Sequence, residues 1–146
     1  MKKLFLIFFL LLLTSCREQK KSNTDPDPVI TTREAPVNPT KNLLTITHPK
    51  EGDQISTPLR LEGRARGYWF FEADAPVVLL DENYRILAQT YITAIGDWMT
   101  EDWVDFRGEL SFPHPQTKTG FLIFHKANPS GLKENITSDT IRVIFK

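Results

Sequence analysis

The chain has 146 residues with 18 basic and 18 acidic side chains, and 11% of its residues are aromatic. This balance argues against nucleic-acid binding, which requires a basic face, and against membrane binding through a polybasic segment. The single cysteine allows no internal disulfide, so an apolar core must stabilise what the length predicts to be one small domain.

The first sixteen residues have the order of a lipoprotein signal. Lys2 and Lys3 precede an apolar run over residues 4–13, and small residues then lead to Cys16, the only cysteine. The run is half of the about 20 residues that a transmembrane helix needs. A plain signal peptide with a free cysteine is the alternative, but a lone thiol is unusual in an exported protein. We therefore expect residues 1–15 to be removed and Cys16 to carry lipid.

The expected lipid on Cys16 sets the location and the following segment sets the reach. Two or three acyl chains hold a protein firmly on a membrane. We expect the outer membrane if the source is Gram-negative, since Arg17 follows the cysteine, and otherwise the outer face of the cell membrane. Residues 16–42 carry four prolines among polar side chains, which predicts a disordered tether with a coil span of about 25–30 Å. Removing the two signal lysines leaves 18 − 2 = 16 basic against 18 acidic residues, a slightly acidic mature protein.

From residue 43 to residue 146 the pattern changes to short alternating runs with turn signals between them. The expected strands are 44–47, 59–63, 69–73, 77–80, 86–95, 104–112, 120–125 and 140–145. We expect Pro76 to separate the third strand from the fourth. This spacing predicts an all-β fold, an immunoglobulin-like antiparallel β-sandwich of about seven strands. A small closed barrel is the alternative, and the Cys–Trp–Cys pattern of antibody domains is absent.

Several blocks of sequence carry a resemblance to a known family. They are GRARGYWFFEA at 63–73 with PV at 76–77, GDWMT at 96–100 ahead of Trp103 and Phe106, GFL at 120–122, NPSG at 128–131, and the final run at 141–145. Together they resemble the immunoglobulin-like domain associated with bacterial sporulation and spore germination proteins. The resemblance implies a binding or scaffold module, often in exported lipoproteins, with no catalytic activity and no cofactor.

The aromatic residues of the predicted domain are the first candidates for a binding surface. Trp69, Phe70 and Phe71 are adjacent, so in a strand they would point to both faces. A buried core is the leading interpretation, and it fits Phe70 or Phe71 better than Trp69. The alternative is a platform for glycan or peptide, because exposed aromatic rings are frequent binding hot spots. The candidate binding residues are Tyr68, Trp69, Trp98, Trp103, Arg64 and Arg66.

Two arginines alternate along the chain, so they share one face. Arg64 and Arg66 flank Ala65, and Glu72 and Asp74 share a face in the same way. The leading interpretation is a ladder of cross-strand ion pairs, which contributes little when exposed. The alternative is an arginine that binds a carboxylate or phosphate with two hydrogen bonds.

The acidic residues around Trp98 and Trp103 have two interpretations. Asp97, Asp102 and Asp105 lie with Glu101 within nine residues, and Ca²⁺ requires six to eight oxygens. The preferred interpretation is that Asp97 caps a turn by accepting hydrogen bonds from the backbone of Met99 or Thr100. No two histidines have zinc spacing and no nucleophile elbow is visible, so we expect no metal site and no catalytic residue.

Three functional hypotheses remain. The first is a non-catalytic binding module that engages an envelope protein or a cell-wall polymer. The second is a passive structural or assembly domain of the envelope. The third is a cell-wall hydrolase that uses Glu72, Asp97 or Glu101, which we disfavour because so small a sandwich has little room for a cleft.

Overall fold

The computed structural model describes residues 40–146, and the predicted signal, the lipidation residue Cys16 and nearly all of the predicted tether lie outside the described residues. The compact unit that contains the described part spans Ala35–Lys146. Within residues 40–146, no helix is long and apolar enough to cross a membrane.

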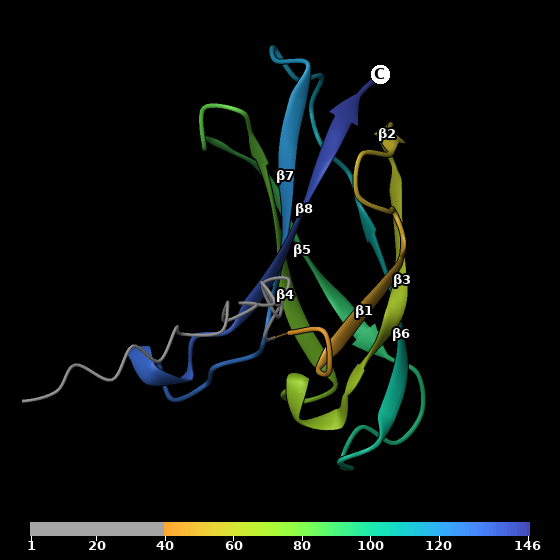
Figure 1. Ribbon diagram of the computed structural model, residues 1–146, viewed down its shortest axis with the longest axis vertical. Coiled ribbons are helices and arrows are strands. Elements are labelled where there is room, and N and C mark those ends of the chain that lie inside the picture. Colours follow the sequence, from red (N-terminus) through yellow and green to blue (C-terminus); the bar gives the residue numbers. More distant parts are fainter. Residues whose placement is uncertain (1–39) are drawn as a thin grey trace, which may run out of the picture. The chain divides into compact units, whose positions relative to one another are not determined.

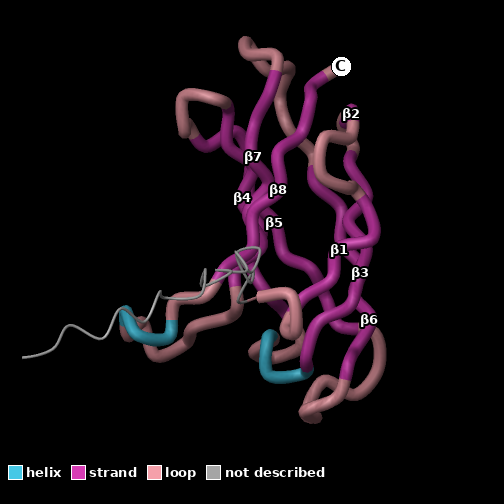
Figure 2. Tube along the Cα trace, in the orientation of Figure 1, coloured by secondary structure: helices cyan, strands magenta, loops and turns pink. Residues whose placement is uncertain are grey.

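The described residues form eight strands and two short 3₁₀-helices (Figures 1 and 2). The elements are β1 (Leu44–His48), β2 (Gln54–Ile55), β3 (Leu59–Arg66), η1 (Gly67–Trp69), β4 (Asp74–Asp81), β5 (Ile86–Ala94), β6 (Trp103–Leu110), β7 (Thr119–His125), η2 (Lys133–Asn135) and β8 (Ser138–Phe145). The all-β, immunoglobulin-like fold predicted from the alternating runs is confirmed.

All eight strands belong to one hydrogen-bonded sheet that folds into two layers, in the order β1-β3-β6-β5-β4-β7-β8-β2. Strand β5 connects the layers, because Ile92 pairs with Ala75 of β4 and also with Gly108 of β6. All pairs are antiparallel except β2 with β8. The end strands β1 and β2 do not pair with each other, so the sheet is open along this seam rather than closed as a barrel.

The core lies between the layers and follows the period-2 pattern of the strands. Buried and half-buried residues alternate along β4 and β7 without a break. Phe106 lies in the core with its ring 6.4 Å from that of Phe70 and 6.2 Å from that of Phe124. Gly63 faces the same ring, and a Cβ at this position would lie 2.6 Å from Phe106 Cζ. Burial of a side chain of this size contributes about 1.5–3 kcal/mol of transfer free energy. Aromatic and aliphatic residues share the core, because Leu, Ile, Val and Ala side chains are buried beside the phenylalanines and Trp69.

Two sequence expectations about the middle of the chain are wrong. Residues 69–73 form no strand: η1 ends at Trp69, and a tight turn follows in which Phe71 and Asp74 exchange backbone hydrogen bonds of 3.0 and 3.1 Å. Glu72 and Ala73 take positive φ values of 52° and 67°, which a strand does not allow. The aromatic run has β propensity, but the chain must reverse here to start β4, and tertiary packing decides the outcome.

Pro76 does not separate two strands but lies inside β4. It pairs with Tyr91 of β5, whereas the pairing of β4 with β7 begins only at Val77. Proline is tolerated in a strand where one edge makes no ladder, so Pro76 occupies the part of β4 that has a single neighbour. The two-residue strand β2 was not predicted, because it is too short to show a period.

Candidate binding site

Helix η1 and the loop that precedes β6 meet at the end of the sandwich opposite Lys146 (Figure 1). The N–H of Gly67 donates to the carbonyl of Asp102 at 3.0 Å. A Cβ on Gly67 would collide with the carbonyl oxygens of Trp98 and Thr100. Only glycine therefore lets η1 approach the loop this closely.

Side chains of the loop hold its own backbone in place. Asp97 Oδ1 accepts a hydrogen bond from the N–H of Met99 at 2.9 Å, as the turn interpretation of Asp97 predicted. Thr100 Oγ1 accepts one from the N–H of Asp102 at 3.1 Å. These two bonds hold the backbone of the loop in one conformation.

A hollow of about 460 Å³ lies between η1 and this loop. It is lined by Gly67, Tyr68, Trp98, Met99, Thr100 and Glu101. Tyr68 is 46% exposed, while Trp98 is half-buried and packs against the core, so its position is supported from below. Lys126 lies above the Tyr68 ring, with its Nζ atom 5.6 Å from the ring centre. Two aromatic side chains and the acidic side chain of Glu101 thus line one open hollow, and the ammonium group of Lys126 lies over one of the two rings.

Trp69 does not contribute to this surface. Its side chain is 0% exposed, and its carbonyl accepts a hydrogen bond from the N–H of Ala127 at 2.9 Å. Phe70 is also buried, whereas Phe71 is 47% exposed. We expected Phe70 or Phe71, rather than Trp69, to be the buried residue. This expectation is wrong for Trp69, because η1 directs its indole into the core. Trp69 is therefore no longer a candidate for the binding surface.

The two arginines of β3 stack on one tryptophan of β6. The guanidinium carbons of Arg64 and Arg66 lie 5.0 and 4.6 Å from the centre of the Trp103 ring. Arg66 also donates to two carbonyls, with Nε 3.3 Å from Asn42 O and Nη1 3.3 Å from Glu101 O. Arg66 therefore ties the loop and the start of the domain to β3, and Arg64 is the more exposed of the two.

The predicted ladder of ion pairs among Arg64, Arg66, Glu72 and Asp74 is not formed within residues 40–146, although other opposite charges face each other across β3 and β6. Arg60 lies opposite Glu109, Glu62 opposite Arg107 and Arg64 opposite Asp105. Within residues 40–146, however, the one ion pair shorter than 4.0 Å joins Arg60 to Glu62 on the same strand, at 3.7 Å. Neither Glu72 nor Asp74 reaches these arginines: Glu72 is in the turn before β4, and Asp74 accepts a hydrogen bond from Thr93 Oγ1.

The acidic residues do not form a catalytic or metal-binding cluster in the described part of the chain. Asp97 is occupied by its own loop and Glu101 lines the hollow, whereas Glu72 lies in a separate turn. Among residues 40–146, no group of three or more potential ligands could hold a metal ion. The three acids considered for hydrolysis thus come from two segments, the turn before β4 and the loop before β6.

Sequence reasoning missed Lys126 as part of this surface. It follows β7 directly and reaches Tyr68 only because β7 and the segment after it run back toward η1. No local signal marks such a long-range contact. Met99 and Thr100 were considered only as the backbone that Asp97 caps, although their neighbours Trp98 and Glu101 were singled out.

Comparison with known proteins now identifies the family. Residues 43–131 match the model of the immunoglobulin-like domain of bacterial spore germination, so the chain belongs to this family. The family is not a known family of enzymes. Neither the curated proteins nor the solved structures gave a significant match.

Proposed function

We propose that this protein is a non-catalytic binding module of the bacterial cell envelope, anchored by lipid on Cys16 and engaging an envelope protein or a cell-wall polymer. The observation that carries the proposal is the hollow between η1 and the 95–102 loop. Its two aromatic side chains and the carboxylate of Glu101, with Lys126 over the Tyr68 ring, provide the kind of surface to which peptides and sugars bind.

The location rests on the order of the first sixteen residues. A basic start, an apolar run of half the length of a membrane span and a cysteine after small residues support export and lipidation. Metabolic labelling of the full chain with a palmitate analogue tests this part, with Cys16→Ser as the control. Equal labelling of both forms would contradict the anchor.

The binding role is tested by crosslinking at the hollow. A photo-reactive amino acid at Tyr68 and, separately, at Trp98 is expected to give adducts in living cells, which mass spectrometry identifies. The same residue at Tyr91, which is 61% exposed on β5, is the matched control. Protein adducts would make this a protein-recruiting module, and glycan adducts would make it a wall binder.

A quantitative version uses Tyr68→Ala and Trp98→Ala against Tyr91→Ala. Loss of one exposed aromatic contact is expected to weaken capture by about tenfold or more. Sedimentation with purified peptidoglycan measures the wall-binding arm, and thermal unfolding checks that each variant is folded. If neither position gives adducts and neither variant alters capture, the domain is a passive structural element of the envelope.

A further inference from the structure

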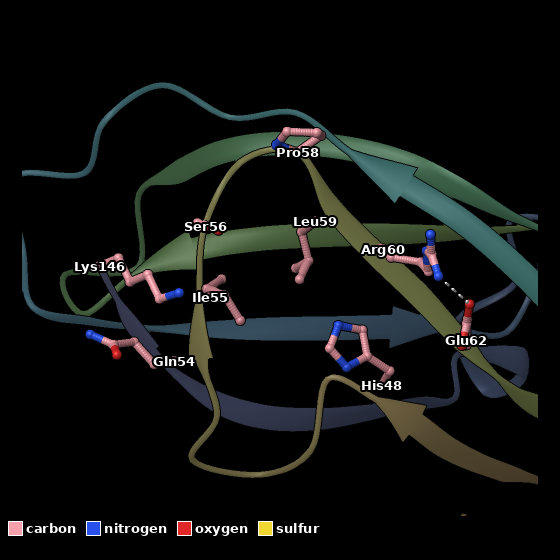
Figure 3. Close-up of a pocket in the computed structure, with 9 residues that line it drawn as sticks. All are labelled: His48, Gln54, Ile55, Ser56, Pro58, Leu59, Arg60, Glu62 and Lys146. Atoms are coloured by element: carbon pink, nitrogen blue, oxygen red, sulfur yellow. Dashed lines mark ion pairs between the residues drawn. The ribbon is translucent and has the colours of Figure 1, made fainter.

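A second hollow of about 520 Å³ lies on the open seam of the sheet (Figure 3). It is lined by His48 at the end of β1, Gln54 and Ile55 of β2, Ser56, Pro58, Leu59, Arg60 and Glu62 of β3, and Lys146. We call this hollow the seam groove. Strand β2 and η1 are at opposite ends of the sandwich in Figure 1, so the seam groove is separate from the hollow at Tyr68 and Trp98.

One wall of the seam groove is a strand edge without a neighbour. Strand β1 pairs only with Glu62–Ala65, whereas β6 pairs with all of β3. Residues 59–61 therefore have a strand on one side only. The N–H of Arg66 donates to Leu43 on the β1 side, and peptide groups alternate in direction along an antiparallel strand. By this alternation, the N–H and C=O of Arg60 point to the open side.

The opposite wall of the seam groove is formed by β2, where one residue also directs its peptide group away from the neighbouring strand. The carbonyls of Asp53 and Ile55 accept hydrogen bonds from Ile144 and Lys146 of the β8 segment, at 3.0 and 3.1 Å. The residue between them, Gln54, consequently directs its peptide group away from β8. Gln54 is exposed and lines the seam groove.

The side chains of the seam groove define what kind of strand fits there. Ile55 and Leu59 are buried beneath it, at 3% and 4% exposure, and give it an apolar floor. Its rim carries the side-chain cations Arg60 and Lys146 and one acidic side chain, Glu62, which is paired with Arg60 at 3.7 Å, so the excess positive charge among these side chains is that of Lys146. A strand with apolar side chains on one face and a carboxylate on the other would complement both features.

We propose that the seam groove binds an extended, carboxylate-bearing segment of a partner protein, which adds as a strand to the Leu59–Leu61 edge. Strand addition draws its affinity from main-chain hydrogen bonds and its specificity from alternate side chains. The peptide group of Arg60 supplies the main-chain hydrogen bonds. The apolar floor of Ile55 and Leu59 and the cations of Arg60 and Lys146 supply the specificity. This inference goes beyond the binding role proposed for Tyr68 and Trp98 and does not depend on it.

The experiment uses the isotope-labelled full chain in detergent micelles and a soluble peptide of about eight residues that alternates Glu and Val. NMR titration is expected to shift the amide resonances of Arg60 and Gln54 and to leave Tyr68 unchanged. A Lys/Val peptide of the same length is expected to bind about tenfold more weakly. A Glu/Val peptide methylated on alternate backbone nitrogens is expected to lose binding, because it cannot complete the ladder.

Two variants distinguish binding at the seam groove from a general effect of net charge. Arg60→Glu is expected to weaken Glu/Val binding by about tenfold, while Arg85→Glu, the same change in the β4–β5 turn, is expected to leave it unchanged. Circular dichroism confirms that both variants fold. Binding that survives backbone methylation, or that shifts Tyr68 instead of Arg60, would overturn the proposal.

The other possible occupants give distinct results in the same experiment. Concentration-dependent shifts at Arg60 without peptide, together with a dimer in sedimentation, would assign the seam groove to a second copy of the chain. Resonances of residues 24–34 that respond together with Arg60 in the free protein would assign it to the chain's own amino-terminal segment. Either result would overturn the proposal of a partner protein.

Discussion

Arg66 and Trp103 lie directly opposite each other on β3 and β6, and the guanidinium carbon lies 4.6 Å from the centre of the indole ring. The same guanidinium donates to the carbonyls of Asn42 and Glu101. One side chain therefore connects the start of the domain, the two strands and the loop that forms the candidate site. Arg64 stacks on the same ring, at 5.0 Å.

The two arginines should differ in their effect on stability. Arg66→Ala removes two hydrogen bonds and a cation–π contact and is expected to lower the free energy of unfolding by about 1–2 kcal/mol. Arg64→Ala removes the exposed cation–π contact and is expected to cost about 0.5 kcal/mol. Urea denaturation at matched ionic strength measures both. Equal losses would contradict the distinction between a structural arginine and a surface arginine.

Trp69 should act as a core residue without a polar role. Trp69→Ala is expected to destabilise the domain by about 3–5 kcal/mol through the cavity it leaves. Trp69→Phe should cost clearly less, because within the described residues the buried Nε1 has no hydrogen-bond partner to lose. Thermal and chemical unfolding of the two variants gives the comparison. A Phe variant as unstable as the Ala variant would show that the indole nitrogen has a partner, such as an ordered water.

Gly63 should tolerate no side chain. An added Cβ would collide with the carbonyl of Thr45 and lie 2.6 Å from Phe106 Cζ, so Gly63→Ala is expected to cost about 3 kcal/mol by overpacking. Gly131→Ala is the matched control, because its φ of 67° is strained but no atom lies within 4 Å of the added Cβ. The control is expected to cost about 1 kcal/mol. Similar losses at both positions would mean that β1 and β3 adjust more easily than their contact implies.

His125 should make stability depend on pH on the acidic side. Burial lowers its pKa below the ordinary value of 6.5, so the unfolded chain binds a proton more readily than the folded one. This contribution to stability is complete above 6.5 and is lost as the pH falls through the lowered pKa. Unfolding free energies of wild type and His125→Gln from about pH 8 to about pH 5 should diverge in slope below 6.5. Parallel profiles would show that His125 is not the responsible group.

The sequence predicted the strands of this fold better than the turns that connect them. The runs around Leu44, Leu59 and Phe106 were predicted as strands, and each is one in the structure. The aromatic run at 69–73 was assigned to a strand because propensity alone favours it. What decided its conformation was the reversal before β4 and the close approach of Gly67 to a loop some thirty residues later in the chain.

The candidate site was predicted in its residue types rather than in its geometry. Asp97 as a turn cap followed from local chemistry, and the structure confirms the bond to Met99. The exposure of Tyr68, the burial of Trp69 and the contact of Lys126 with the tyrosine ring depend on which segments meet at the end of the sandwich. Such meetings are set by strand order, which no local pattern in the sequence contains.

The edge of β8 is covered at Arg142 by two residues of the turn between β1 and β2. Glu51 Oε2 accepts the N–H of Arg142, and the carbonyl of Arg142 accepts the N–H of Gly52. Bare strand edges are the places where β domains join into polymers, and this short segment prevents growth from the β8 side at Arg142. The stretch of β3 that lacks a second neighbouring strand is three residues long. Strand addition at the β8 edge is thus blocked at Arg142, whereas β1 and residues 59–61 of β3 each keep one edge without a neighbouring strand.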